Sequence, residues 1–182
     1  MVIDWLIEIH QIFNFRERTL FMTVQLLDKY LTKKIILFEE LQSLAITALN
    51  IASKEEEVEY PILDNYITVS GDILAKKDLI NMETKLLVSI NYKIITPSML
   101  DFFEIFASIC NLNPVEISQA LYLMNIIILD VNMLKYKASI LAFAILNIVT
   151  KKDKEKPKMQ PQEENQAISN KKQKIDFTNF LE

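Results

Sequence analysis

Residues 39–54 read EELQSLAITALNIASK, and this stretch decides the fold class. Between its charged ends, one side of the predicted helix is apolar and the other side carries no charge. A helix that is uncharged all round is packed on several sides. We therefore predict that 39–54 is the central helix of a bundle.

Helical periodicity extends in both directions from this segment. Four more helices are predicted to surround the central one, over 3–13, 17–32, 61–68 and 76–90. A linker ending at Thr96-Pro97 follows, because a residue before proline favours extended backbone. A second helical group is then predicted over 98–110, 114–130 and 134–149.

Periodicity is lost from Lys151 onward. Residues 151–174 are polar, contain two prolines and lack aromatic residues, so they cannot bury enough apolar surface to fold alone. We predict a first bundle over 1–95, a second, partial helical domain over 96–150 and a mostly disordered polar tail over 151–182.

Composition supports an all-α chain. The 182 residues are 51% hydrophobic and include a single glycine, which argues against most β architectures and against a glycine-rich phosphate loop. The one cysteine, Cys110, has no partner for an internal disulfide, so a reducing compartment is expected.

Charge and hydropathy exclude several partners. The formal net charge of −4 argues against an extended nucleic-acid-binding face. The apolar runs are far shorter than the ~20 residues that span a bilayer. Asp4 and Glu8 stand where a secretion signal carries basic residues. We expect a soluble intracellular protein, nuclear or cytoplasmic, that binds neither nucleic acid nor membrane.

Enzymatic constellations are missing from the sequence. His10 is the only histidine, and we expect it on the polar side of the first helix rather than in a catalytic set. Cys110 is expected to be a small buried hydrophobe. Glu55, Glu56 and Glu57 point in different directions on any helix, which makes a poor metal cage. We predict no catalytic residues, no metal and no cofactor.

Lys54 and Glu83 are charged positions within otherwise apolar helices. Exposed ion pairs contribute only about 0–1 kcal/mol, so spacing alone does not distinguish this pair from two solvated charges.

Several motifs in order carry a family resemblance. VIDWLIEIH at 2–10, TLFMTVQLLDKYL at 19–31, LQSLAITALNIASKEEE at 41–57 and NMETKLL at 81–87 resemble the first cyclin box of A/B-type cyclins. LDVNMLKYKASILAFAIL at 129–146 is similar, more weakly, to a segment of the second box. The resemblance implies the cyclin fold, a five-helix bundle followed by a second, related helical domain.

The resemblance also implies a regulatory subunit that binds and activates a cyclin-dependent Ser/Thr kinase. In that family, the residues matched by Lys54 and Glu83 reach the kinase backbone. Ile51, Leu87 and Ile94 would supply the apolar part of the kinase face.

A second site is implied by the same resemblance. Family members recruit docking peptides of substrates or inhibitors through a shallow apolar groove, matched here by Val2, Trp5 and Gln42.

The chain departs from the family pattern at three places. Glu55 replaces the large apolar residue expected after the lysine, and we include it in the kinase-binding set. The Met-Arg pair that the family has before the first motif is missing. In the family, the arginine of that pair binds the aspartates matched here by Asp4 and Asp28, and we expect these two aspartates to be structural. The second box stops after its third helix, so we expect that Ile140, Phe143, Ile145 and Ile148 cannot all be buried by 98–149 alone. We also expect 175–182 to fold back onto this box as a short helix.

Alternative functions stay open. The departures at Glu55 and in the second box favour a cyclin-fold adaptor that binds proteins without activating a kinase. A cyclin-fold transcription initiation factor would need a basic surface that a net charge of −4 does not supply.

Overall fold

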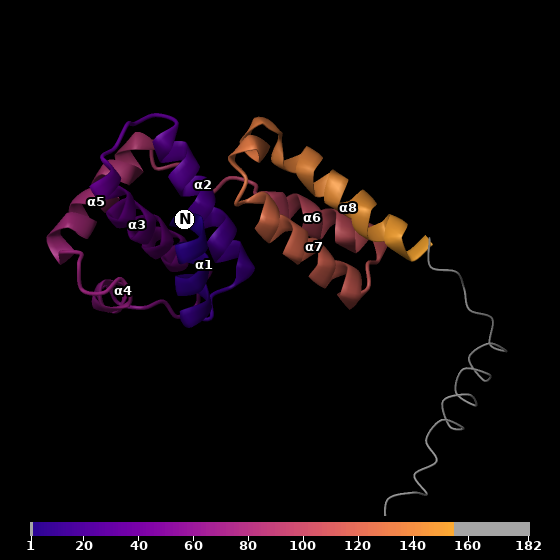
Figure 1. The fold of residues 1–182 in the computed structure, drawn as a ribbon, viewed down its shortest axis with the longest axis horizontal. Coiled ribbons are helices and arrows are strands. Elements are labelled where there is room, and N and C mark those ends of the chain that lie inside the picture. The colour runs from indigo at the N-terminus through magenta and orange to yellow at the C-terminus, as the bar shows by residue number, and fades with distance from the viewer. Residues whose placement is uncertain (1, 155–182) are drawn as a thin grey trace, which may run out of the picture.

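The computed structural model describes residues 2–154 of the chain, and all regular elements within them are helical. Two helical groups lie side by side (Figure 1). The first contains five helices: α1 (Val2–Ile12), α2 (Glu17–Leu31), α3 (Phe38–Glu56), α4 (Leu63–Val69) and α5 (Lys76–Ser89). The second contains α6 (Met99–Cys110), α7 (Pro114–Ile127), the short 3₁₀ helix η1 (Val131–Lys135) and α8 (Ala138–Lys154).

The prediction that 39–54 forms a central helix is confirmed. α3 packs against α1, α2, α4 and α5, and every residue from Leu44 to Ser53 is buried. Tyr66 of α4 is also fully buried, and its hydroxyl lies 2.7 Å from the Ser53 hydroxyl. Burial raises the pKa of Tyr66 to about 12, against the opposing effect of that hydrogen bond.

Two predicted boundaries differ from the structure. The fourth helix begins at Leu63, after Pro61 and Ile62, rather than at the proline. The segment predicted as one helix over 134–149 is divided between η1 and α8. Both groups are all-helical, as predicted.

α8 continues through Lys154, four residues beyond the predicted end of the second domain at residue 150. Lysines are good helix formers and are favoured in a last helical turn, which explains the extension. The remaining predictions for the tail, including docking of 175–182, lie outside the described residues.

Each group has its own core, with one exception to the division. The second core is formed by buried residues of α6, α7 and α8, including Phe103, Met124 and Ile145. Phe21 of α2 is 3% exposed and belongs to this second core, not to the first. The first group, which we call the first box, therefore contributes an aromatic ring to the interior of the second group, the second box.

Two side chains lie differently from the sequence prediction. His10 is buried, and its Nε2–H donates to the backbone carbonyl of Arg16 at 2.9 Å. It lies one helical turn after buried Leu6, on the apolar face of α1. Cys110 is exposed because it is the last residue of α6, beyond the buried face of that helix.

Candidate functional site

Lys54 and Glu83 are brought together at one edge of the first bundle. Lys54 is in the last turn of α3, Glu83 is in the middle of α5, and the Lys54 Nζ lies 2.5 Å from the Glu83 Oε1. Their side chains are 36% and 26% exposed, so the pair remains partly accessible to solvent. An ammonium has three donors and a carboxylate has several acceptor positions, so the pair can bind both an N–H and a C=O of another backbone.

Apolar side chains next to this pair are only partly available. Leu87 lies one turn after Glu83 on the same face of α5 and is half-buried, as is Ile94 in the following loop. Ile51 is 4% exposed and packs inside the first core. Contrary to the prediction, Ile51 does not contribute to the accessible face, because its side chain is enclosed by the bundle.

The three glutamates after Lys54 have separate environments. Glu55 is exposed, and its side chain has no hydrogen bond or ion pair among the described residues. Glu57 Oε1 accepts from the backbone N–H of Arg16 at 2.8 Å and from the Thr19 hydroxyl. Glu56 faces Arg18, with an Oε2 to Nε distance of 4.0 Å. The run of like charges is therefore divided among different partners.

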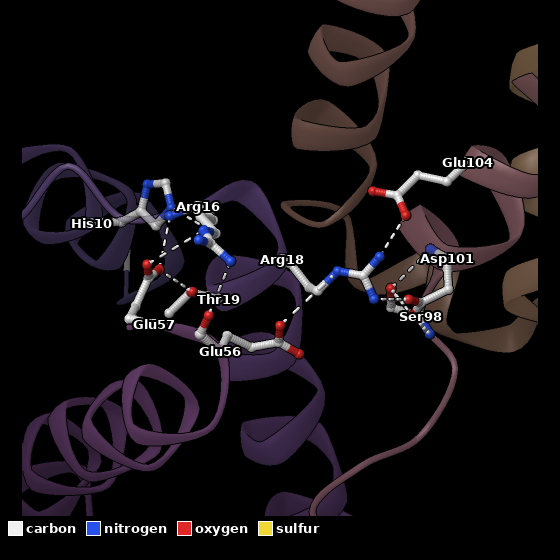
Figure 2. A network of polar contacts seen from close by, with 9 residues as sticks. All are labelled: His10, Arg16, Arg18, Thr19, Glu56, Glu57, Ser98, Asp101 and Glu104. Atoms are coloured by element: carbon white, nitrogen blue, oxygen red, sulfur yellow. Dashed lines mark hydrogen bonds and ion pairs between the residues drawn. The ribbon is translucent and has the colours of Figure 1, made fainter. Parts of the chain in front are cut away.

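Arg18 joins this end of α3 to the second box (Figure 2). Its Nη1 donates to Asp101 and its Nη2 donates to Glu104, both on α6. Burial acts to lower the pKa of Arg18, but the attraction of Asp101, Glu104 and Glu56 outweighs it and raises the pKa.

Asp101 has two structural roles at the same point. It accepts from the backbone N–H of Ser98 at 2.6 Å, while the Ser98 hydroxyl accepts from the Asp101 N–H, forming a capping box at the start of α6. Burial acts to raise the pKa of Asp101, but the hydrogen bonds from Ser98 and the charge of Arg18 lower it overall. The Arg18 contact is therefore anchored to the first turn of α6.

Glu56 differs from Asp101 in the direction of its pKa shift. Burial raises its pKa, and the repulsion of Asp101, Glu55 and Glu57 adds to the effect, while Arg18 opposes it. The geometry explains why: Arg18 approaches Glu56 only at 4.0 Å but donates hydrogen bonds to the two acids of α6.

The predicted groove residues lie at the α1/α3 side of the first box. Val2, Trp5 and Gln42 are all half-buried. Val2 lines a cavity of about 480 Å³ together with Leu41, whereas Trp5 and Gln42 do not line it. The structure therefore places the three residues on neighbouring helices without joining them in one pocket.

Asp4 and Asp28 both line that same cavity. Asp4 is exposed, and Asp28 is partly buried on α2. Burial raises the pKa of Asp28 to about 6, and no cation contacts its carboxylate among the described residues. Asp28 also lines a second cavity of about 240 Å³ between the two boxes.

Sequence reasoning did not identify the contacts between the boxes. Arg18 and Asp101 are 83 positions apart, and neither helical spacing nor composition relates them. One local signal was present: Ser98 followed three residues later by Asp101 is a helix-start pattern, which identifies the acid as a cap but not as a partner of Arg18.

Within residues 2–154, no group of three or more histidine, cysteine or acidic side chains is arranged to hold a metal ion. None of the helices in that range combines the length and hydropathy needed to cross a membrane.

Two family models match the chain. The model for the cyclin N-terminal domain matches residues 1–95, and the model for the cyclin C-terminal domain matches residues 97–176. The junction between the matches coincides with the linker before α6.

Relatives and solved structures agree with these matches. Cyclin-B2-2 of Arabidopsis thaliana is 31% identical over 142 residues, covering 78% of this chain and 33% of that protein. G2/mitotic-specific cyclin-B of Arbacia punctulata is 31% identical over 146 residues, covering 80% of this chain and 36% of that protein. The chain thus spans about a third of the length of these relatives.

The fold has a solved counterpart as well. The structure of a viral cyclin from herpesvirus saimiri matches with a TM-score of 0.75 and 18% identity, covering 86% of this chain and 71% of the viral chain. That identity supports the fold alone, but the family models cover almost the whole chain, from residue 1 to residue 176. This chain belongs to the cyclin family.

Proposed function

We propose that the chain is a regulatory subunit that binds and activates a cyclin-dependent Ser/Thr kinase and so controls cell-cycle progression. Cyclins are regulatory subunits of kinases and not enzymes themselves, and the relatives include proteins named as G2/mitotic cyclins. The observation that carries the proposal is the Lys54–Glu83 pair, which links α3 and α5 at an accessible edge.

The proposed mechanism is a shift between two states of the kinase. Lys54 donates to a backbone carbonyl of the kinase, and Glu83 accepts from a backbone N–H. If these contacts form only with the active arrangement of the kinase, binding favours that arrangement by the difference in affinity between the two states. The existing ion pair supports this role because it holds both side chains near their binding positions before the partner arrives.

Lys54→Ala and Glu83→Ala test the proposal. Each change leaves a kinase backbone group, and the remaining member of the pair, without a partner, and we expect a loss of about 2–5 kcal/mol in binding. Affinity is measured with a purified cyclin-dependent kinase, and activation is measured as phosphorylation of a histone-type substrate.

A matched control is available on the same helix. Lys85 of α5 forms an ion pair with Glu40 of α3 at 3.6 Å, and both side chains are more exposed than Lys54 and Glu83. Lys85→Ala removes a lysine that links the same two helices but is expected to leave kinase affinity unchanged. Equal affinities for Lys54→Ala, Glu83→Ala and Lys85→Ala would contradict the assignment.

A second candidate function is favoured by Glu55. This exposed carboxylate stands beside Lys54, where an apolar contact would strengthen a kinase interface. A cyclin-fold adaptor that binds kinase or other proteins without activation would tolerate the charge. Kinase binding without stimulated histone phosphorylation would identify the adaptor.

Docking of substrate or inhibitor peptides is a further part of the proposal. Val2, Trp5 and Gln42 would contact the peptide from α1 and α3, and the half-buried state of all three leaves atoms available. A regulator of this class would act in the nucleus or the cytoplasm, together with its kinase.

A further inference from the structure

α8 carries an apolar face that the rest of the described chain leaves uncovered. Ile140, Phe143 and Ile148 are 55%, 56% and 46% exposed and follow helical spacing along one face. Ile145 and Val149, on the opposite face, are buried in the second core. α8 lies at the upper right edge of the second group (Figure 1). It is therefore apolar on two faces, and only one is packed.

α6 continues this surface. Phe106 is half-buried, and its ring meets the Phe143 ring edge to face, with centroids 6.1 Å apart. Ile109, one turn after Phe106, is 72% exposed. We call the combined surface the α6/α8 band; it consists of Phe106, Ile109, Ile140, Phe143 and Ile148. Contiguous apolar surface of this kind marks an interaction site.

The chain beyond α8 contains one segment with a matching pattern. Residues 155–174 are polar, but 175–182, IDFTNFLE, contains Phe177, Phe180 and Leu181 at the i, i+3 and i+4 positions of a helical face. We propose that residues 175–182 bind the α6/α8 band as a short amphipathic helix. An isolated segment of this length is not stably helical in water, so its helix forms only on the band.

The connecting length suits this contact. From Lys154 back to Ile140 is about 21 Å along α8, at 1.5 Å per residue. A chain the length of 155–174 has a typical end-to-end span of about 25 Å or more when it is charged. A tether that matches the distance to its site gives an effective concentration of the order of millimolar.

Charge favours this occupant over a second copy of the protein. The last four residues of α8 read KKDK at 151–154, a net charge of +2 in the sequence, whereas 175–182 contains Asp176 and Glu182 and no basic residue. Two α6/α8 bands packed in parallel would bring these two basic helix ends together. The segment 175–182 instead presents the opposite charge.

Adjacent substitutions in the segment provide a matched test. Phe180→Asp places a charge on the proposed apolar face, whereas Asn179→Asp places the same charge on the opposite face. Hydrogen exchange of the amides of 175–182 is measured in the full chain and in an isolated peptide of that sequence. We expect at least tenfold protection in the parent and in Asn179→Asp, and none in Phe180→Asp.

Variants of the band complete the experiment. Phe143→Ser should also remove the protection, while Tyr122→Ser, at an exposed aromatic of α7, should not. Circular dichroism verifies that each variant is folded, and sedimentation velocity gives its oligomeric state. Exchange of 175–182 at the peptide rate in the folded parent would overturn the proposal. So would a dimer that Phe143→Ser dissociates and Phe180→Asp does not, because the band would then belong to a second copy.

Discussion

Phe21→Ala should destabilise the second box, although Phe21 belongs to a helix of the first. The ring is 3% exposed and packs in the core formed by α6, α7 and α8. Removing a buried phenylalanine ring costs about 3–5 kcal/mol, because the transfer free energy is lost and a cavity is left. Since the ring packs in this second core, the loss of stability should be concentrated in the second box.

The chain contains a natural probe for separating the two boxes. Trp5 is its only tryptophan and lies in α1, packed against the first core, so its fluorescence follows the first box. Far-UV circular dichroism follows all helices. With a urea m-value of about 2 kcal/mol/M, the expected loss moves the unfolding midpoint of the second box down by about 1.5–2.5 M. The two signals should therefore separate in Phe21→Ala, with circular dichroism changing first.

Leu26→Ala is the matched control, because Leu26 lies on the same helix but is fully buried in the first core. This change should lower the midpoint seen by Trp5. A single transition in Phe21→Ala, with coincident signals, would refute the separate stability of the second box. A loss below about 1 kcal/mol would refute the central position of Phe21 in its core.

Three further predictions concern charged groups. Glu55→Phe should tighten kinase binding by adding buried apolar area at about 25 cal/mol/Å²; weaker binding by the folded variant would locate the interface elsewhere. Asp28→Asn should raise the free energy of unfolding at pH 7 by about 1–2 kcal/mol, after allowance for the exposed part of the carboxyl. The folded-state pKa of about 6 lies above the unfolded value, so the stability of the parent falls as pH rises between about 4 and 6. The stability gain of Asp28→Asn should therefore vanish below pH 4. A gain that is independent of pH in urea titrations would contradict this. Arg18→Ala should lower the free energy of unfolding by about 1–2 kcal/mol at low salt and by less at high salt, as measured by thermal unfolding. Lys76→Ala, which removes an exposed ion pair with Asp64, should lower it by less than about 1 kcal/mol in the same measurement.

Local patterns predicted the helices because helix formation depends on neighbours three and four positions away. α3 is the clearest case, since an uncharged surface on both sides of 39–54 has no explanation except burial on both sides. The Lys54–Glu83 pairing was available only through the family resemblance. Nothing in the spacing of the two residues indicates that α3 and α5 meet at those positions.

Single polar residues are harder to place from sequence, and His10 shows the physical reason. Its residue type predicts the polar side of α1, but its position one turn after Leu6 puts it on the buried face. The missing information was an acceptor: the carbonyl of Arg16 satisfies the ring nitrogen and makes burial tolerable. That carbonyl becomes available only when the chain turns back after Asn14, which adopts a left-handed conformation with φ 52°.

The end of α3 connects the proposed kinase face to the second box. A helix C-terminus disfavours neighbouring carboxylates, so the sequence Lys54-Glu55-Glu56-Glu57 is unfavourable on its own. In the structure this is offset because Glu57 accepts a hydrogen bond at the start of α2 and Glu56 faces Arg18. Arg18 in turn donates to Asp101 in the first turn of α6. A partner that binds Lys54 contacts a helix end whose adjacent residues are tied to both boxes. Movement of that helix end on binding would therefore alter the contact between Glu56 and Arg18, which spans 4.0 Å.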